Sequence, residues 1–221
     1  MTRLLLINPN TDAATTARMA EIARGAIAGV TIETATARSG ARLITNPAQL
    51  AAAALAVDAL LDDAALDGID GVIIAAFGDP GLAELRRRLS IPVTGIAEAA
   101  MAKAAEGDRR FSVATTTPEL ADGIRAAADA YGHRKLLISI RATIEDPAAL
   151  MADERRLVEA LAAACDSALR VDGAQAVVIG GGPLAQAARV LRDRFAEPII
   201  EPLPAAVGLA LLRAQSRPLG R

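Results

Sequence analysis

The stretch Gly71-Val-Ile-Ile-Ala-Ala-Phe-Gly-Asp-Pro-Gly-Leu82 decides the fold. It begins with a short apolar run, typical of a strand buried on both faces, and continues into glycine and proline residues that mark a loop. A helix-length segment follows, so the stretch is one unit of an α/β protein. In open parallel sheets the ligand binds beyond the carboxyl ends of the strands, which here means at Ala75, Ala76 and Phe77. None of these three side chains carries a reactive group.

Strand-like runs alternate with helix-length segments along the whole chain. The expected strands are Arg3–Ile7, Val30–Thr34, Gly71–Ala75, Ile91–Gly95, Phe111–Ala114, Lys135–Ile140, Ala176–Ile179 and Pro198–Ile200. The expected helices span about residues 12–28, 48–67, 80–89, 97–106, 117–131, 152–171, 183–195 and 203–214. This alternation predicts parallel sheets covered by helices.

The second half of the chain repeats the layout of the first. The landmarks that match are Ile7 with Val113 and Pro92 with Pro198, each 106 residues apart, and Ile73 with Val178, 105 apart. Such a repeat predicts an α/β fold of two similar parallel-sheet βα lobes, related by a pseudo-twofold axis, with a cleft between them. We expect residues 1–96 plus about 204–221 to form the N-terminal lobe and residues 97–203 the C-terminal lobe.

Composition excludes several classes of function. The 221 residues carry 24 basic and 26 acidic side chains, so no basic surface for nucleic acid is expected. One cysteine and one histidine exclude a disulfide framework and a histidine-rich metal site, and we expect neither a metal nor a cofactor. No apolar run approaches the ~20 residues of a membrane span, so we expect no membrane partner and a soluble, cytoplasmic protein.

Equivalent loops of the two lobes are expected to line one site for a small-molecule substrate. The candidate binding residues are Asn10, Thr11, Ala76, Phe77, Gly78, Thr115, Thr116, Gly181 and Gly182. Backbone N–H groups at helix N-termini favour anions, and glycine lets a ligand approach the backbone closely. The set suits a small carboxylate or a cyclic amide. Purely structural interpretations stay open, because residues 8–11 are also typical of a turn and helix start, and Asp79 before a proline is typical of an N-cap.

Four stretches together resemble the aspartate/glutamate racemase superfamily, and most closely its hydantoin/allantoin racemase-like branch. They are Ile7-Asn8-Pro9-Asn10-Thr11, Phe77-Gly78-Asp79-Pro80-Gly81-Leu82, Pro92-Val93-Thr94-Gly95-Ile96-Ala97-Glu98-Ala99 and the glycine-rich turn at 180–184. The resemblance covers nearly the whole chain and implies a two-lobed, cofactor-independent isomerase. We also expect a homo-oligomer.

The residues at two key positions do not support the family's usual mechanism. In that family two cysteines, one per lobe, flank the substrate carbon, and one removes a proton while the other delivers one. The resemblance places Ala76 and Gly181 at these two positions, and neither side chain can carry a proton.

Four other titratable residues are candidates to replace the two missing cysteines. Cys165 lies within an alanine-rich helix and is expected to be a buried apolar residue, and His133 is expected at the amino end of the sheet. Glu98 and Glu201 follow final strands and are the candidate catalytic bases, with a structural role as the alternative. Three functions stay open: a racemase-like enzyme acting on a small carboxylate or cyclic ureide, a lyase, decarboxylase or hydrolase that uses the same oxyanion-binding cleft, and a non-catalytic binding protein.

Overall fold

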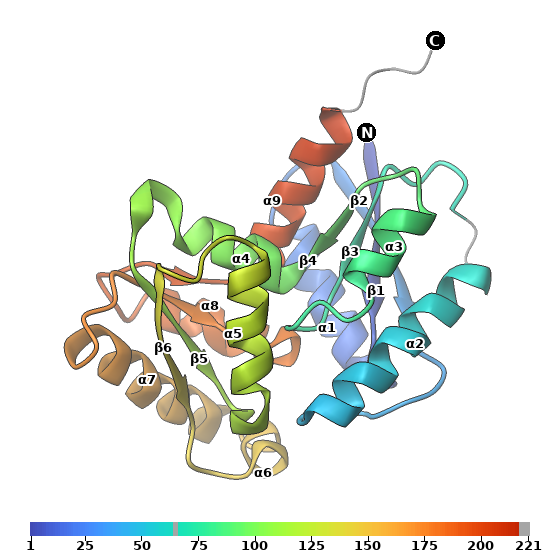
Figure 1. Cartoon of the computed structure of the whole chain (residues 1–221). Coiled ribbons are helices and arrows are strands. Elements are labelled where there is room, and N and C mark those ends of the chain that lie inside the picture. The colour runs from blue at the N-terminus through green and yellow to red at the C-terminus, as the bar shows by residue number, and fades with distance from the viewer. Residues whose placement is uncertain (64–65, 217–221) are drawn as a thin grey trace.

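The computed structural model describes residues 1–63 and 66–216 and has two parallel sheets of four strands each (Figure 1). In the first sheet the order is β2-β1-β3-β4, formed by β1 (Thr2–Asn8), β2 (Val30–Thr36), β3 (Gly71–Ile74) and β4 (Val93–Gly95). In the second the order is β6-β5-β7-β8, formed by β5 (Phe111–Thr115), β6 (Leu137–Ala142), β7 (Ala176–Ile179) and β8 (Ile199–Ile200). The second order is the first with four added to every strand, so the prediction of two similar α/β lobes is confirmed.

Helices connect successive strands and cover both sheets. The α-helices are α1 (Ala13–Arg24), α2 (Pro47–Asp63), α3 (Leu82–Arg88), α4 (Ile96–Ala104), α5 (Ala121–Ala130), α6 (Pro147–Met151), α7 (Glu154–Arg170), α8 (Ala185–Arg192) and α9 (Pro202–Gln215). Short 3₁₀ turns are η1 (Glu106–Asp108), η2 (Pro118–Leu120) and η3 (Gly182–Leu184). Each expected helix is present within a few residues; residues 64 and 65 of the one expected at 48–67 lie outside the described part.

Helix α6 was not expected from the sequence. It has five residues, too few for a hydrophobic period to show. Its start depends on Asp146, whose side chain accepts a hydrogen bond from the Ala149 N–H, and on Pro147 in the first turn. The helix expected at 117–131 is also divided, because residues 118–120 form the turn η2 before α5 begins.

Alternate residues of the strands face different cores. In β1, Leu4 and Leu6 belong to a large core shared by both lobes, whereas Leu5 and Ile7 pack with apolar residues of α2 and α3. Successive strand residues point to opposite faces of a sheet, so both faces of the first sheet are buried. In the second sheet, Val177 and Ile179 pack instead with α7 and α8.

Two helices join the lobes. Helix α4 follows the last strand of the first sheet and packs on β7 and β8 of the second, while α9 follows the second sheet and packs on β1, β3 and β4 of the first. Figure 1 shows α9 returning along the first lobe. Most of the segment expected at about 204–221 belongs to α9, and residues 217–221 are outside the described part.

The length and apolar character of the helices determine whether any of them could span a membrane. Within the described ranges, no helix has both the length and the apolar character needed to cross a membrane.

Candidate functional site

A pocket lies between the two lobes, at the carboxyl ends of the central strands. Its lining residues are Asn10, Leu43, Ile44, Ala75, Ala76, Phe77, Thr116, Thr117, Leu120, Met151, Gly180, Gly181, Gly182, Pro183 and Leu184. The position of the pocket follows from the topology, because the loops after β1, β3, β5 and β7 all end at this edge.

Six of the sequence-predicted binding residues line this pocket. They are Asn10, Ala76, Phe77, Thr116, Gly181 and Gly182. They form three pairs across the repeat, because Asn10 and Thr116 are 106 residues apart, while Ala76 and Phe77 are each 105 residues from Gly181 and Gly182. Equivalent positions of the two lobes therefore face one site.

The other three predicted binding residues, Thr11, Gly78 and Thr115, are not among the lining residues. The Thr115 hydroxyl donates to the Gly180 carbonyl oxygen at 3.0 Å, so it ties the loop after β5 to the end of β7. Thr11 donates its backbone N–H to the Ala41 carbonyl oxygen at 3.1 Å. Gly78 has a φ of 108° and serves the turn that follows Phe77.

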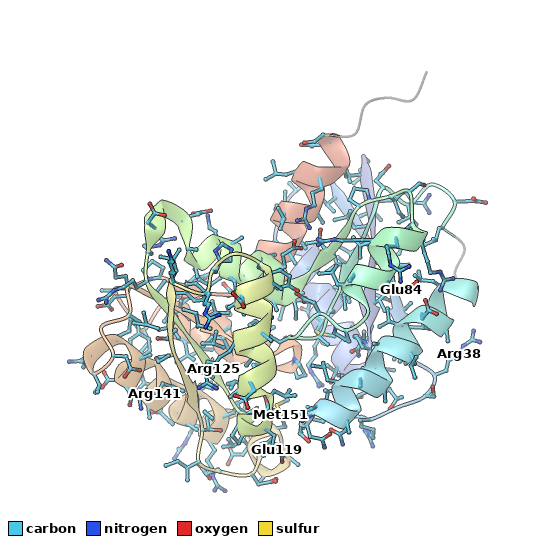
Figure 2. All side chains as sticks on the ribbon, in the orientation of Figure 1. Arg38, Glu84, Glu119, Arg125, Arg141 and Met151 are labelled. Carbon is cyan, nitrogen blue, oxygen red and sulfur yellow. The ribbon has the colours of Figure 1, made fainter. Side chains whose placement is uncertain are left out.

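Sequence reasoning missed the apolar part of the lining. Leu43 and Ile44 come from the loop between β2 and α2, and Met151 ends α6, where Figure 2 labels it. Leu120 and Leu184 are contributed by the turns η2 and η3. None of these residues follows a strand directly, so no sequence signal placed them at the ligand edge.

Hydrogen bonds orient Asn10 and leave part of it available. Its side-chain oxygen accepts from the Asn8 side-chain nitrogen at 2.8 Å and from the Asp12 N–H at 3.3 Å. Asn8 also donates to the Thr16 hydroxyl at 2.9 Å, so the loop is cross-linked. Within residues 1–63 and 66–216, the Asn10 NH₂ group has no partner, and this orientation offers it as a donor in the pocket.

Several other donors of the pocket also lack partners in the described part of the chain. They are the backbone N–H groups of Ala76, Phe77, Thr116 and Gly182, together with the Thr116 hydroxyl. Neutral donors without protein partners at a pocket can bind a carbonyl oxygen of a ligand and stabilise the negative charge that develops on it during enolate formation. The arrangement is therefore suited to an electron-rich oxygen of a small ligand.

The pocket contains no titratable side chain among its described lining residues. It lacks an acid, a base and a counter-charge of its own. Within residues 1–63 and 66–216, no group of three or more His, Cys, Asp or Glu side chains is arranged to hold a metal ion.

Glu98 lies outside the pocket lining and is bound by two arginines. It pairs with Arg213 of α9 and with Arg86 of α3, at oxygen–nitrogen distances of 2.7 to 2.9 Å. Burial opposes ionisation of Glu98, but the hydrogen bonds from Arg213 and Arg86 outweigh it and lower its pKa. This pairing fixes α9 to the first lobe, and the geometry gives no support to Glu98 as a catalytic base.

Glu201 also lies outside the lining. Its Oε1 accepts from Arg192 at 2.7 Å, and Oε2 is 3.8 Å from the Arg189 guanidinium. The residue precedes α9 and its side chain is only 6% exposed. The structure does not bring Glu98 and Glu201 into the pocket, so a catalytic role for either remains a prediction from sequence.

Asp79 does not have the role expected from its sequence context. Helix α3 begins at Leu82 with Gly81 as its N-cap, so Asp79 does not cap the helix that follows it. Its carboxylate instead accepts the Ala97 and Glu98 N–H groups in the first turn of α4, at 2.9 and 2.8 Å. The expected local cap is wrong: Asp79 has a φ of 50° rather than the extended backbone of an N-cap residue, and its carboxylate binds α4 instead.

The chain's one cysteine and one histidine lie elsewhere. Cys165 is completely buried among apolar residues of α7, and burial raises the pKa of its thiol to about 12. His133 packs edge-on against Phe111, the first residue of β5, with ring centroids 6.3 Å apart. It therefore lies at the amino end of the sheet, opposite the pocket, and burial lowers its pKa.

Comparison with known proteins gives a consistent family. The model of the Asp/Glu/hydantoin racemase family matches residues 4–210. A hydantoin racemase of Paenarthrobacter aurescens is 31% identical over 210 residues, which cover 94% of this chain and 89% of that protein.

Two solved structures have closely similar folds. An allantoin racemase from Klebsiella pneumoniae has a TM-score of 0.88 and 34% identity, covering 96% of this chain and 87% of that one. An allantoin racemase from Pseudomonas fluorescens has a TM-score of 0.90 and 28% identity, covering 100% and 98%.

Proposed function

Because the chain belongs to the Asp/Glu/hydantoin racemase family, we propose that it is an enzyme that acts on a small cyclic ureide or carboxylate in the interlobe pocket, without a two-cysteine mechanism. The observation that carries this proposal is a pocket whose described lining offers several neutral donors and no titratable side chain. The chain contains a single cysteine, so two thiols of one chain cannot flank a substrate carbon.

The lining favours a cyclic ureide over a dicarboxylate. A ureide ring is neutral and presents carbonyl oxygens, which suit the N–H groups of Phe77 and Gly182 and the amide of Asn10. A bound dicarboxylate would bring two negative charges into a site whose described lining has no cation, and unpaired buried charge is costly. The names of the hydantoin and allantoin racemases that this chain resembles also point to cyclic ureides.

The chemistry we propose uses the donors and solvent. Water or hydroxide removes the proton from the ring carbon next to a carbonyl, and the electron pair moves onto the carbonyl oxygen. The donors of the pocket hold this oxyanion, as in other enzymes where one such donor contributes about 10²–10³-fold in rate. Water then returns a proton to the carbon from either face, which inverts part of the substrate.

Solvent deuterium exchange tests this proposal. Enantiopure hydantoins, allantoin and aspartate are incubated in D₂O with the unaltered protein and with the double variant Ala76→Cys/Gly181→Cys. General acid–base groups contribute about 10²–10⁴-fold each, so we expect slow exchange in the unaltered protein and a large gain in the double variant. Fast exchange on both faces by the unaltered protein would show that another acid–base pair does the work.

The space available for a cysteine side chain differs between positions 76 and 181. Ala76 already has a Cβ, whereas a Cβ added to Gly181 would meet Cγ of Leu184 at 2.8 Å. The Gly181 backbone is extended at a φ of 176°, so only the Leu184 side chain has to shift. The double variant is therefore expected to fold, and the single Ala76→Cys variant is its control for one restored thiol.

A non-catalytic binding protein is the second candidate, because the lining residues that the structure describes include no titratable group. Binding measured by calorimetry without exchange or product would favour it. Ring opening or loss of carbon dioxide, detected by NMR of the same samples, would instead favour the hydrolase, lyase or decarboxylase alternative.

A further inference from the structure

A buried carboxylate lies directly behind the pocket-lining segment. Asp79 is two residues beyond Phe77, is 5% exposed, and follows Gly78 in a turn where both residues have positive φ. This turn directs the carboxylate at the start of α4. A Cβ on Gly95 would lie only 2.1 to 2.4 Å from the carboxyl atoms, so the absence of a side chain there makes the contact possible.

The second lobe reaches the same carboxylate. Tyr131, which follows α5, donates its hydroxyl to Oδ2 of Asp79 at 2.7 Å. Its ring packs against the shared core and also against the core of the first lobe that contains Leu85 and Val93. One phenol thus crosses from the second lobe to the first.

We propose that Asp79 and Tyr131 form a latch that holds the two lobes closed around the pocket, with Asp79 as a positioning residue for the Ala76–Phe77 segment. The latch joins three parts that have to keep their relative positions: the loop after β3, the crossover helix α4 and the end of α5. Hydrogen bonds to a carboxylate are among the stronger ones in proteins, and burial removes competition from water.

Charged groups lie close to the latch. Glu98 is the nearest charged neighbour of Asp79 on α4, and Arg213 and Arg86 neutralise it. Removing the Tyr131 hydroxyl leaves the two bonds from α4 to Asp79 in place. The variant Tyr131→Phe therefore tests the Tyr131–Asp79 bond alone.

The chain offers a matched control within one lobe. The Ser139 hydroxyl donates to Oδ2 of Asp172 at 2.5 Å, and both residues belong to the second lobe. Ser139→Ala therefore also removes a hydroxyl–carboxylate bond, but one that does not cross between lobes.

Interlobe distances measured by electron paramagnetic resonance decide the proposal. Spin labels are placed at Leu55→Cys in α2 and Val171→Cys after α7, both 75% exposed, in a Cys165→Ala background. We expect Tyr131→Phe to broaden the distance distribution or lengthen its mean, and Ser139→Ala to leave it unchanged. An unchanged distribution in Tyr131→Phe, or an equal change in both variants, overturns the latch.

Intrinsic fluorescence gives a second measurement. The chain has no tryptophan and one tyrosine, so tyrosine emission reports Tyr131 alone. A carboxylate that accepts from a phenol quenches its emission, so Asp79→Asn is expected to raise emission at least two-fold at neutral pH. Equal emission in the folded Asp79→Asn variant and the unaltered protein would contradict the contact in solution.

A binding measurement connects the latch to the pocket, and only this step rests on the proposed function. The probe is 5,5-dimethylhydantoin, which has no proton on the substituted carbon and cannot be racemised. We expect about ten-fold weaker affinity in Tyr131→Phe and no change in Ser139→Ala. If the unaltered protein does not bind the probe, the proposed ligand class is wrong, while the distance measurement still decides the latch.

Discussion

The loops after β3 and β7 occupy equivalent positions in the two lobes, yet they are held in different ways. The first, residues 75–79, is anchored by the buried carboxylate of Asp79. The second, residues 180–182, has no side chain at all and lies close to the first lobe. A Cβ on Gly182 would come within 2.6 Å of the Ala75 carbonyl oxygen, and one on Gly180 within 3.4 Å of the Phe77 ring.

The difference shows how one repeat forms two halves of a single pocket. The first loop keeps its shape through hydrogen bonds to α4 and to the second lobe. The second loop fits because the absence of side chains lets its backbone approach the partner lobe. The contribution of the first loop to stability should therefore depend on pH. The contribution of the second loop should depend on the volume of the side chains placed in it.

The largest effect that we predict concerns Asp79. Burial raises its pKa from 3.8 to about 6, so the folded state binds this proton more tightly than the unfolded chain does. Its contribution to the free energy of unfolding should therefore fall as the pH rises from about 4 to about 6, by on the order of 3 kcal/mol. Asp79→Asn cannot titrate and should lack this fall.

Urea denaturation at pH 4 and pH 7 measures the effect in both proteins. Carboxylates with lowered pKa values, such as Asp172 and Glu98, change stability in the opposite direction, so the informative quantity is the difference between the two pH profiles. Parallel pH profiles for Asp79→Asn and the unaltered protein would show that Asp79 does not cause this change in stability.

Added volume in the second loop should have the next largest effect. In Gly182→Ala the new methyl group meets the Ala75 carbonyl oxygen, which belongs to the backbone and cannot turn aside. Overpacking of this kind costs about 2 kcal/mol, measured as a lower free energy of unfolding. Gly123→Ala is the control, because a Cβ there has no neighbour within 4 Å and alanine favours the helix α5. Equal stability of the two variants would show that the lobes are farther apart than described.

Asn10 and Thr116 occupy equivalent positions in the two lobes, and variants at these positions compare how each lobe contributes to ligand affinity. Thr116→Val removes a hydroxyl that has no partner in the described part of the chain, so ligand affinity should fall by about 1 kcal/mol with little change in stability. Asn10→Ala also removes the bonds to Asn8 and Asp12, and should lower both affinity and stability. Calorimetry measures the affinity of the two variants, and urea denaturation measures their stability. A loss of stability in Thr116→Val would show that the Thr116 hydroxyl has a structural role within the protein.

The smallest expected effect is at Cys165. Its thiol is buried and its pKa is raised to about 12, so it carries no charge near neutral pH and lies away from the pocket. Cys165→Ala should leave deuterium exchange unchanged, and thiol reagents should react with Cys165 only when the protein unfolds. Loss of exchange in this variant would assign the residue a role that the structure does not support.

Sequence reasoning identified the two lobes and six of the fifteen pocket-lining residues for a simple reason. Parallel strands end at the same edge, so residues that follow them, such as Asn10, Ala76 and Gly181, are brought together by topology alone. It missed Leu43 and Met151, because the loop between β2 and α2 and the short helix α6 reach the pocket without a periodic signal.

Chain order, apolar periodicity and the 105–106 residue repeat determined the two-lobed α/β fold, because strand and helix periods are local properties of a sequence. The tertiary structure alone decided the partners of the charged residues. Glu98 was close enough to a strand end to suggest catalysis, but Arg86 and Arg213 bind it. Asp79 was typical of a local cap, but its carboxylate joins α4 and Tyr131. Hydrogen bonds between residues 52 or 115 positions apart depend on how distant elements pack, and no local pattern encodes them.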